Sequence, residues 1–241
     1  MTTRTDEIAD GIFRISTSVP IPAIPGGFTF NQILIQDEAP LLFHTGPRRL
    51  FEATRAAIER VLPVASLRYL GYSHFEADEC GAMNDFLALA PAAVPLCGRV
   101  GAMVSMGDVA DRPPRAMGDG EELDLGRHRI QWLDTPHVPH GWDAGLIWVA
   151  TVHTLLCGDL FTQPGSDLPP VTEGDILGPS VAMRAGMDYY SCPDKARTTL
   201  ARLAELQPAI LATMHGSSYR GDGAALLNAL SMTLSELPAS H

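Results

Sequence analysis

His74, Glu76 and Asp78 are three side chains that can bind a metal ion, and they alternate along one short stretch of the sequence. They follow the apolar segment 67–72, which is typical of a buried strand that ends in a loop. In an extended loop, alternate side chains point to the same side of the backbone. Because neighbouring carboxylates are costly to hold together without a positive charge, the stretch indicates one cation or a pair of cations. The alternative is a solvated acidic loop, since a string this short also occurs without a metal.

Three further candidate ligands come much later in the sequence. His140, Asp159 and His215 each follow an apolar segment that is typical of a strand. Each side chain could therefore lie at a strand end, above one edge of a sheet. Together with the strand before His74, this makes four strand ends that carry candidate ligands, which favours a metal site over a solvated loop.

The order and spacing of these residues resemble those of the metallo-β-lactamase superfamily, and in particular its flavodiiron branch. The general superfamily pattern is H-x-H-x-D-H, followed by a His, an Asp and a His. Glu76 stands where this pattern has its second His, and that substitution marks the flavodiiron type. The resemblance extends over about residues 8–235. It implies a single metallo-β-lactamase-like domain over residues 1–241, with an α/β (α+β) fold in which four layers form an αββα sandwich.

The resemblance also implies a set of ligands for two metal ions. The first ion would be held by His74, Glu76 and His140, the second by Asp78 and His215, with Asp159 between the two. Since Glu76 replaces an imidazole by a carboxylate, it favours iron or manganese over zinc. The implied cofactor is two iron ions, with zinc or manganese as the alternatives.

Two positions depart from the pattern of the relatives. Glu79 stands where relatives have a His directly after the Asp of the motif. Glu79 could bind the second ion, or a solvent molecule could take that place. His44 stands where relatives often carry a structural Asp in a D-T-G string, and we interpret it as a hydrogen-bonded turn residue.

A second histidine competes with His140 as a ligand. His137 lies in a string that resembles the T-P-G-H string of some superfamily members. The spacing to Asp159 and the presence of Asp143 favour His140, which makes His137 a pocket residue. Tyr190, Tyr219 and His137 are the candidates for hydrogen-bond donors to a bound substrate.

The resemblance implies a diiron protein that binds or reduces dioxygen or nitric oxide. Such a protein would act as an oxygen sensor or as a reductase that a separate redox partner supplies with electrons. Flavodiiron enzymes carry a flavodoxin domain after the metal domain, and this sequence ends after its last predicted helix, so we expect no flavin site in this chain. The alternative function is that of a binuclear metallohydrolase, in which a bridging hydroxide attacks an ester, a thioester or a lactone. A sensor or scaffold without catalysis is a third hypothesis.

The composition restricts the class of partner. The 241 residues are 46% hydrophobic, which suffices for one sizeable core, and the net charge of −11 argues against nucleic acid or an anionic membrane as a partner. No apolar run reaches the roughly 18 residues of a membrane span, and the first residues are too polar for a signal peptide. The four cysteines form no C-x-x-C pair. We therefore expect a cytoplasmic protein with reduced thiols, and the resemblance implies a homodimer.

Alternation and turn residues predict the elements that position the candidate ligands. The proline-rich segment 19–27 is predicted to be a loop that overhangs the site. The predicted hairpin comprises residues 31–36 and 40–44, the predicted helices comprise residues 48–61, 81–89, 194–206 and 223–237, and a long loop is predicted over residues 163–180.

Overall fold

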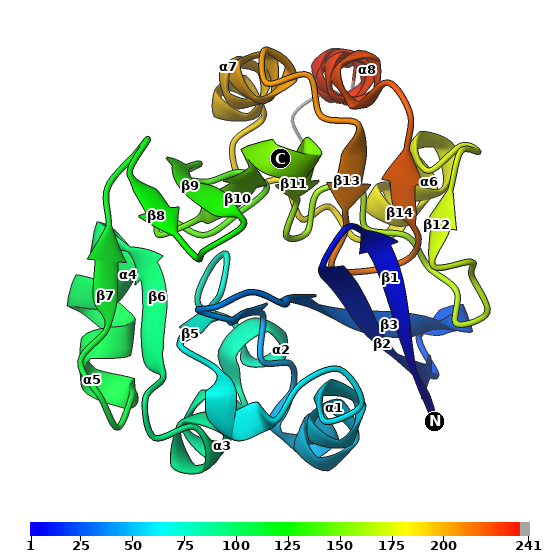
Figure 1. Ribbon diagram of the computed structural model, residues 1–241. Helices are drawn as coiled ribbons and strands as arrows, with labels where there is room; N and C mark the ends of the chain where they lie inside the picture. Colours follow the sequence, from blue (N-terminus) through cyan, green and yellow to red (C-terminus); the bar gives the residue numbers. More distant parts are fainter. Residues whose placement is uncertain (237–241) are drawn as a thin grey trace.

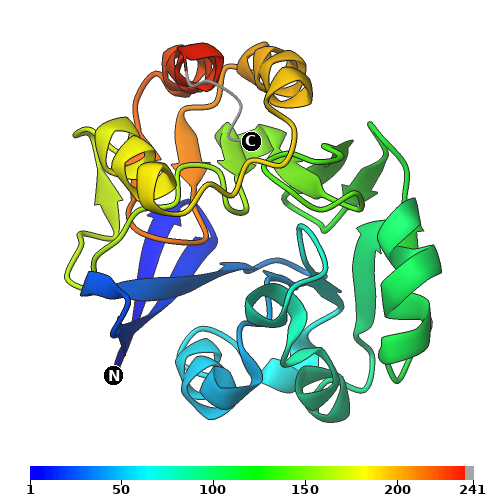
Figure 2. The same ribbon diagram turned by 180° about the vertical axis from the view of Figure 1, so that it is seen from behind.

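The computed structural model describes residues 1–236 and arranges them in four layers (Figures 1 and 2). Two sheets face each other in the middle. Helices α7 (Pro193–Ala204) and α8 (Gly223–Glu236) cover the outer face of one sheet, whereas α1 (Phe51–Ile58) and α3 (Met83–Leu89) cover the outer face of the other. The predicted αββα sandwich is thereby confirmed.

The first sheet contains seven strands in the order of the sequence. Its first four strands pair in an antiparallel manner, and its last four pair in parallel. The strands are β1 (Thr2–Ala9), β2 (Ile12–Ile21), β3 (Ile24–Ile35), β4 (Leu41–Phe43), β5 (Tyr69–Gly71), β6 (Val94–Gly98) and β7 (Arg115–Met117). Every residue of β4 is buried, as expected for a central strand that is covered on both faces.

The second sheet also contains seven strands, in the order β12-β14-β13-β11-β10-β9-β8. Strands β11 and β13 are parallel neighbours although more than fifty residues separate them in the sequence. The strands are β8 (Glu122–Asp124), β9 (Arg129–Asp134), β10 (Gly145–Val149), β11 (Thr154–Leu156), β12 (Val171–Thr172), β13 (Ile210–Ala212) and β14 (Ser218–Arg220).

Short helices connect the strands. They are α2 (Ala77–Cys80), α4 (Arg99–Gly101), α5 (Gly107–Val109), the longer α6 (Leu177–Gly186), the 3-10 helices η1 (Arg48–Leu50), η2 (Val64–Ser66) and η4 (Ala150–Val152), and the π-helix η3 (Ala102–Met106). The predicted helix 194–206 corresponds to α7, which buries Ala196, Leu200 and Leu203 on one face at helical spacing. The predicted helix 223–237 corresponds to α8, and its last residue, Leu237, lies outside the described residues.

Apolar side chains from both sheets meet between the two middle layers. Phe43 and Leu96 of the first sheet pack with Trp132, Ile147 and Leu156 of the second. All five are fully buried. Burial of each such side chain stabilises the folded state by about 1.5–3 kcal/mol relative to leaving it exposed to water. This packing fixes the strand ends of the two sheets relative to each other, and those strand ends carry the candidate ligands.

The prediction of a loop over residues 19–27 is wrong. The segment continues β2 and β3 to a tight hairpin, with Ile21 paired to Ile24. The register shifts between Val19 and Ile21, at Pro20. A proline is tolerated at such an irregularity because the strand loses no regular hydrogen bond there. The segment is therefore a strand extension and not a loop.

The prediction of a loop over residues 163–180 is wrong in its second half. Strand β12 occupies Val171–Thr172, and α6 begins at Leu177. Asp175 Oδ1 accepts hydrogen bonds from the backbone N–H groups of Leu177 and Gly178, at 2.8 and 2.9 Å. An aspartate in this position is a common signal for a helix start, and it was present in the sequence.

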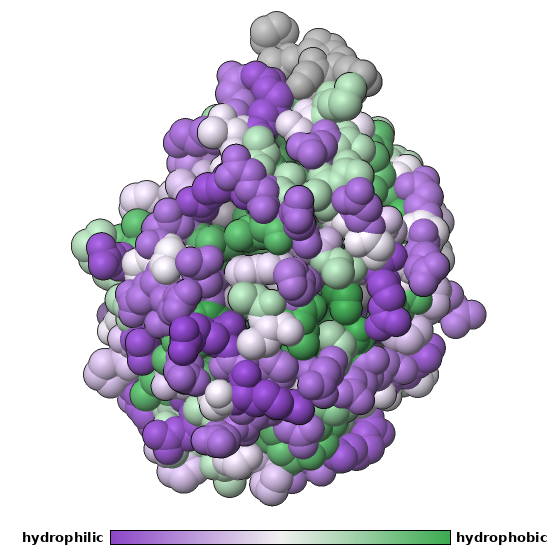
Figure 3. Space-filling view, turned by 45° about the horizontal axis from the view of Figure 1, so that its top comes forward, coloured by the Kyte–Doolittle hydropathy of each residue, from purple (hydrophilic) through white to green (hydrophobic). Residues whose placement is uncertain are grey.

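The surface in Figure 3 is mostly hydrophilic, and its apolar areas are separated by polar residues. Among residues 1–236, no helix combines the length and the apolar character that crossing a bilayer requires.

Candidate metal centre

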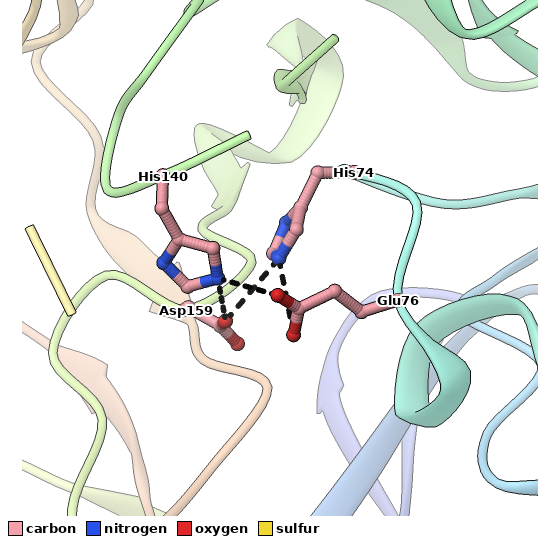
Figure 4. A group of neighbouring side chains, drawn as sticks. All are labelled: His74, Glu76, His140 and Asp159. Carbon is pink, nitrogen blue, oxygen red and sulfur yellow. Dashed lines mark ion pairs between the residues drawn. The ribbon is translucent and has the colours of Figure 1, made fainter. Parts of the chain in front are cut away.

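The candidate ligands converge from loops that follow the strands of both sheets. His74 comes after β5 of the first sheet, whereas His140, Asp159 and His215 come after β9, β11 and β13 of the second. Figure 4 shows the four side chains whose donor atoms all lie within 4.8 Å of one another: His74, Glu76, His140 and Asp159. We call these four the first ligand group.

The donor atoms of the first ligand group point toward one another. His140 Nε2 lies 3.1 Å from Glu76 Oε1, and His74 Nε2 lies 3.5 Å from Glu76 Oε2. Asp159 Oδ2 lies 3.5 Å from His140 Nε2 and 3.7 Å from His74 Nε2. Two imidazole nitrogens and two carboxylates therefore surround one small volume.

A second ligand group, formed by Asp78, Asp159 and His215, shares one residue with the first. His215 Nε2 lies 3.3 Å from Asp159 Oδ1 and 3.6 Å from Asp78 Oδ2. The two oxygens of Asp159 thus face different histidines. Oδ2 faces His74 and His140 of the first group, and Oδ1 faces His215 of the second. A carboxylate in this arrangement can bridge two cations.

Backbone carbonyls hold two of the three imidazoles in place. His140 Nδ1 lies 2.9 Å from the carbonyl oxygen of Tyr189, and His215 Nδ1 lies 2.7 Å from that of Thr29. Because a carbonyl oxygen only accepts, each Nδ1 must carry the proton and donate it. The neutral ring then presents the lone pair of Nε2 to the ligand group. Imidazoles that bind metals are fixed in this manner.

Two glycines allow the loops to pack closely around His74. Gly141 has a φ of +77°, and a Cβ atom there would lie 2.9 Å from His74 Cβ. Gly158 has a φ of +51°, and a Cβ atom there would lie 2.7 Å from Ser73 Oγ. A larger residue would push either loop away from His74, in a backbone conformation that favours glycine.

Glu79 is completely buried, and it contacts His74 on the Nδ1 side of the ring, opposite the Nε2 atom that faces the ligand group. Its Oε2 accepts hydrogen bonds from the backbone N–H groups of Ser73 and His74, at 2.8 and 2.7 Å. Its Oε1 accepts a hydrogen bond from Ser73 Oγ and lies 3.1 Å from His74 Nδ1. His44 Nε2 lies 3.6 Å from the same oxygen. The two positions that depart from the pattern of the relatives, residues 44 and 79, therefore contact each other.

Charges within the ligand groups shift the pKa values of their members. The close approach of the His140 and His74 imidazoles lowers the pKa of Glu76 to about 2. Burial raises the pKa of Asp78 to about 6. Burial by itself would lower the pKa of His140 and His215, but the neighbouring carboxylates of Glu76 and Asp159 outweigh it, so that both pKa values are raised. In the metal-free protein these imidazoles therefore lose their second proton at a higher pH than a free imidazole does.

Metal binding to the ligand groups is expected to release protons and to weaken as the pH falls. The raised pKa values of His140 and His215 mean that these protons are retained to a higher pH than in a free imidazole. A metal ion must displace them, and each displaced proton costs about a factor of ten in apparent affinity per pH unit. Titrating Zn²⁺ into weakly buffered protein with a pH indicator measures the release. An affinity that stays constant between about pH 6 and 8, where histidines titrate, would contradict this prediction.

Other predicted residues lie outside the ligand groups. His137 adopts a φ of +68°, and its backbone N–H donates to the carbonyl oxygen of Gly141. Tyr190 is 5% exposed, and its hydroxyl finds no hydrogen-bond partner among the described residues. It lines a hollow of about 430 Å³ together with Glu76, His140, Asp188, Tyr189 and Ser191. Two members of the first ligand group, Glu76 and His140, therefore border this hollow.

Tyr219 lies on β14, where its ring packs against the apolar core under α7 and α8. A Cβ atom at Gly221 would lie 2.5 Å from its hydroxyl. The described contacts of Tyr219 do not include the ligand groups. The sequence did not predict two residues that orient the site. Thr29 contacts His215 Nδ1 through its backbone carbonyl, and Ser73 donates its hydroxyl to Glu79. A backbone acceptor such as that of Thr29 leaves no signal in the sequence.

Comparisons with known proteins agree with this fold. A family model described as ODP family beta lactamase matches residues 28–216 of the chain. A diflavin flavoprotein of Thermosynechococcus vestitus is 29% identical over 208 residues, which cover 82% of this chain and 35% of that protein. The rubredoxin-oxygen oxidoreductase of Megalodesulfovibrio gigas is 27% identical over 207 residues, which cover 82% of this chain and 50% of that protein. The chain thus spans between a third and a half of the length of these curated relatives.

A solved structure shows the same fold. The rubredoxin oxygen:oxidoreductase of Desulfovibrio gigas matches 98% of this chain with a TM-score of 0.86, at 20% sequence identity, and 63% of that chain is covered. At this identity the match concerns the fold alone.

Proposed function

Because the chain belongs to the ODP family, the metallo-β-lactamase-like domain of flavodiiron proteins, we propose that it is a non-haem diiron protein. It would bind or reduce dioxygen or nitric oxide at the two ligand groups. The name of the rubredoxin-oxygen oxidoreductase relative supports dioxygen as the substrate. A separate electron donor or another part of a longer chain would supply electrons, since the curated relatives extend well beyond the matched region.

The position of Asp159 carries this proposal. Its Oδ2 faces His140 and His74, while its Oδ1 faces His215. The first ion would be held by His74, Glu76, His140 and Asp159, and the second by Asp78, Asp159 and His215. Both His74 Nε2 and Asp159 Oδ1 are buried without a hydrogen-bond partner among the described residues. A cation would satisfy both atoms, whereas leaving them unpaired is costly.

The donor set agrees with iron. Imidazole and carboxylate ligands suit iron, manganese and zinc, and the two ligand groups contain no thiolate. When bound, two ferrous ions would supply two electrons to a small diatomic substrate, and the electron donor would then reduce both ions again. The second ligand group offers three side chains, so that solvent or substrate would complete the coordination of its ion.

Tyr190 is the proposed hydrogen-bond donor to the substrate. Burial raises its pKa well above the ordinary value, and the hydroxyl therefore stays protonated. The same hydroxyl is unpaired among the described residues, and Tyr190 lines the same hollow as Glu76 and His140. His137 and Tyr219 stay predictions for this role. A single domain and a homodimer also stay expectations.

Metal analysis of protein purified without air tests the proposed function. Mass spectrometry should find about two irons per chain, as the ligand set implies, and an optical band should change when air is admitted. A protein that binds zinc and shows no response to air would overturn the proposal. Hydrolysis of esters, thioesters and lactones would then become the activity to assay.

A further inference from the structure

The buried carboxylate of Glu79 has no assigned role in metal binding. It is fully buried on the short helix α2, directly behind the ring of His74. A buried carboxylate is costly unless hydrogen bonds and charges compensate for it. Here both oxygens are engaged, and two imidazoles, those of His74 and His44, lie within 3.6 Å of Oε1.

The contacts of Glu79 determine which ring nitrogen of His74 carries the proton. Oε2 already accepts from two backbone N–H groups, those of Ser73 and His74. Oε1 accepts from the hydroxyl of Ser73, which has a single hydrogen to donate. The remaining neighbour, His74 Nδ1, lies 3.1 Å from Oε1 and 3.1 Å from Ser73 Oγ. Both atoms can accept, so Nδ1 is the donor.

We infer that Glu79 is a positioning residue that fixes the tautomer and the ring orientation of His74, and that it does not bind the second ion. With Nδ1 held by Glu79, Nε2 faces Glu76 and Asp159, at 3.5 and 3.7 Å. Glu79 thereby accepts the Nδ1 proton of His74, as the carbonyls of Tyr189 and Thr29 accept those of His140 and His215. This inference rests on the proposed metal centre.

A purely structural role is the competing explanation. The bonds from Glu79 Oε2 to the backbone of Ser73 and His74 also hold the loop in shape. A glutamine could maintain those two bonds with its amide oxygen. Its NH₂ group would then face Ser73 Oγ and His74 Nδ1 and could only donate. Nδ1 would have to accept, and the proton of a neutral ring would move to Nε2, on the side of the metal.

Glu79→Gln therefore separates the two explanations. We expect it to weaken binding of the first Zn²⁺ equivalent by roughly 10–100-fold, measured by competition with a chelator, because outer hydrogen bonds to metal-binding histidines have effects of this size. Glu79→Asp retains an acceptor at a shorter reach and should give an intermediate affinity. Asp143→Asn is the matched control, since Asp143 is a buried carboxylate that accepts from the N–H of Phe75, at 3.1 Å, and an amide oxygen can replace it. Unchanged affinity in Glu79→Gln would overturn the inference.

A second measurement needs neither a variant nor a metal. The ¹⁵N chemical shifts of the His74 ring, recorded on metal-free wild-type protein at a pH where the ring is neutral, report its tautomer. We expect the proton on Nδ1, and a proton on Nε2 would overturn the inference even if Glu79→Gln fails to fold. If the wild-type protein shows the expected tautomer but binds no metal, the proposed function fails and the placement of the proton stands.

Discussion

Replacement of Asp159 by asparagine is expected to weaken the binding of both metal ions together. Each oxygen of Asp159 faces a different ligand group, and the side chain is almost fully buried. If about 10–16 kcal/mol of binding free energy is divided among four donors, one donor contributes about 3 kcal/mol, which corresponds to roughly 100-fold in affinity. Chelator competition and metal analysis of Asp159→Asn would measure this loss for each ion.

Asp143→Asn is again the control, because it makes the same chemical change at another buried carboxylate in the same region. It should retain both ions. The bridging arrangement would be refuted if Asp159→Asn retained one ion at wild-type affinity. Asp159 would then belong to one ligand group alone.

Replacement of His140 by asparagine is expected to lose the first ion, whereas the same replacement of His137 should retain it. His140 Nε2 approaches Glu76 and Asp159, at 3.1 and 3.5 Å, and a shorter side chain cannot reach that position. His137 lies outside the group, and its φ of +68° suits asparagine. We expect His140→Asn to lower the affinity for the first ion by roughly 100-fold, on the same division of the binding free energy among the donors.

The metal content of the two variants, measured side by side, decides between the two histidines. If His137→Asn loses the ion and His140→Asn retains it, the ligand is His137, and the loop after β9 must then rearrange when metal binds. Equal loss in both variants would indicate that the loop conformation, rather than one imidazole, holds the ion.

Several features of this protein were predictable from the sequence because they depend on local patterns. The buried face of α7 follows from apolar residues at helical spacing. The ligand types were predictable because His74, Glu76 and Asp159 are chemically suited to metals and follow strand-like segments. The αββα fold followed from a resemblance that rests on the same residues. Both the helical spacing and the metal-binding chemistry depend only on the types and order of residues, which the sequence states directly.

Turn-forming residues led to a wrong loop prediction in two segments, of which 19–27 is the clearer case. The segment 19–27 contains three prolines and two glycines, which are typical of a loop, but it forms the end of a long hairpin. The neighbouring strands and the apolar cluster of Val19, Phe28 and Phe30 stabilise this conformation. Tertiary contacts outweighed a weak local preference.

Only the tertiary structure decided how the candidate ligands are held and oriented. The carbonyl of Thr29 fixes His215 across 186 residues of sequence, and a backbone carbonyl has no sequence signature. The sequence left open whether Glu79 binds the second ion, whereas in the structure Glu79 lies on the first turn of α2 and contacts Ser73 and His44. Residue type limits what a side chain can bind, whereas the direction in which it points depends on backbone geometry and on partners from distant segments. The composition of the site could therefore be read from the sequence, and the orientation of its members could not.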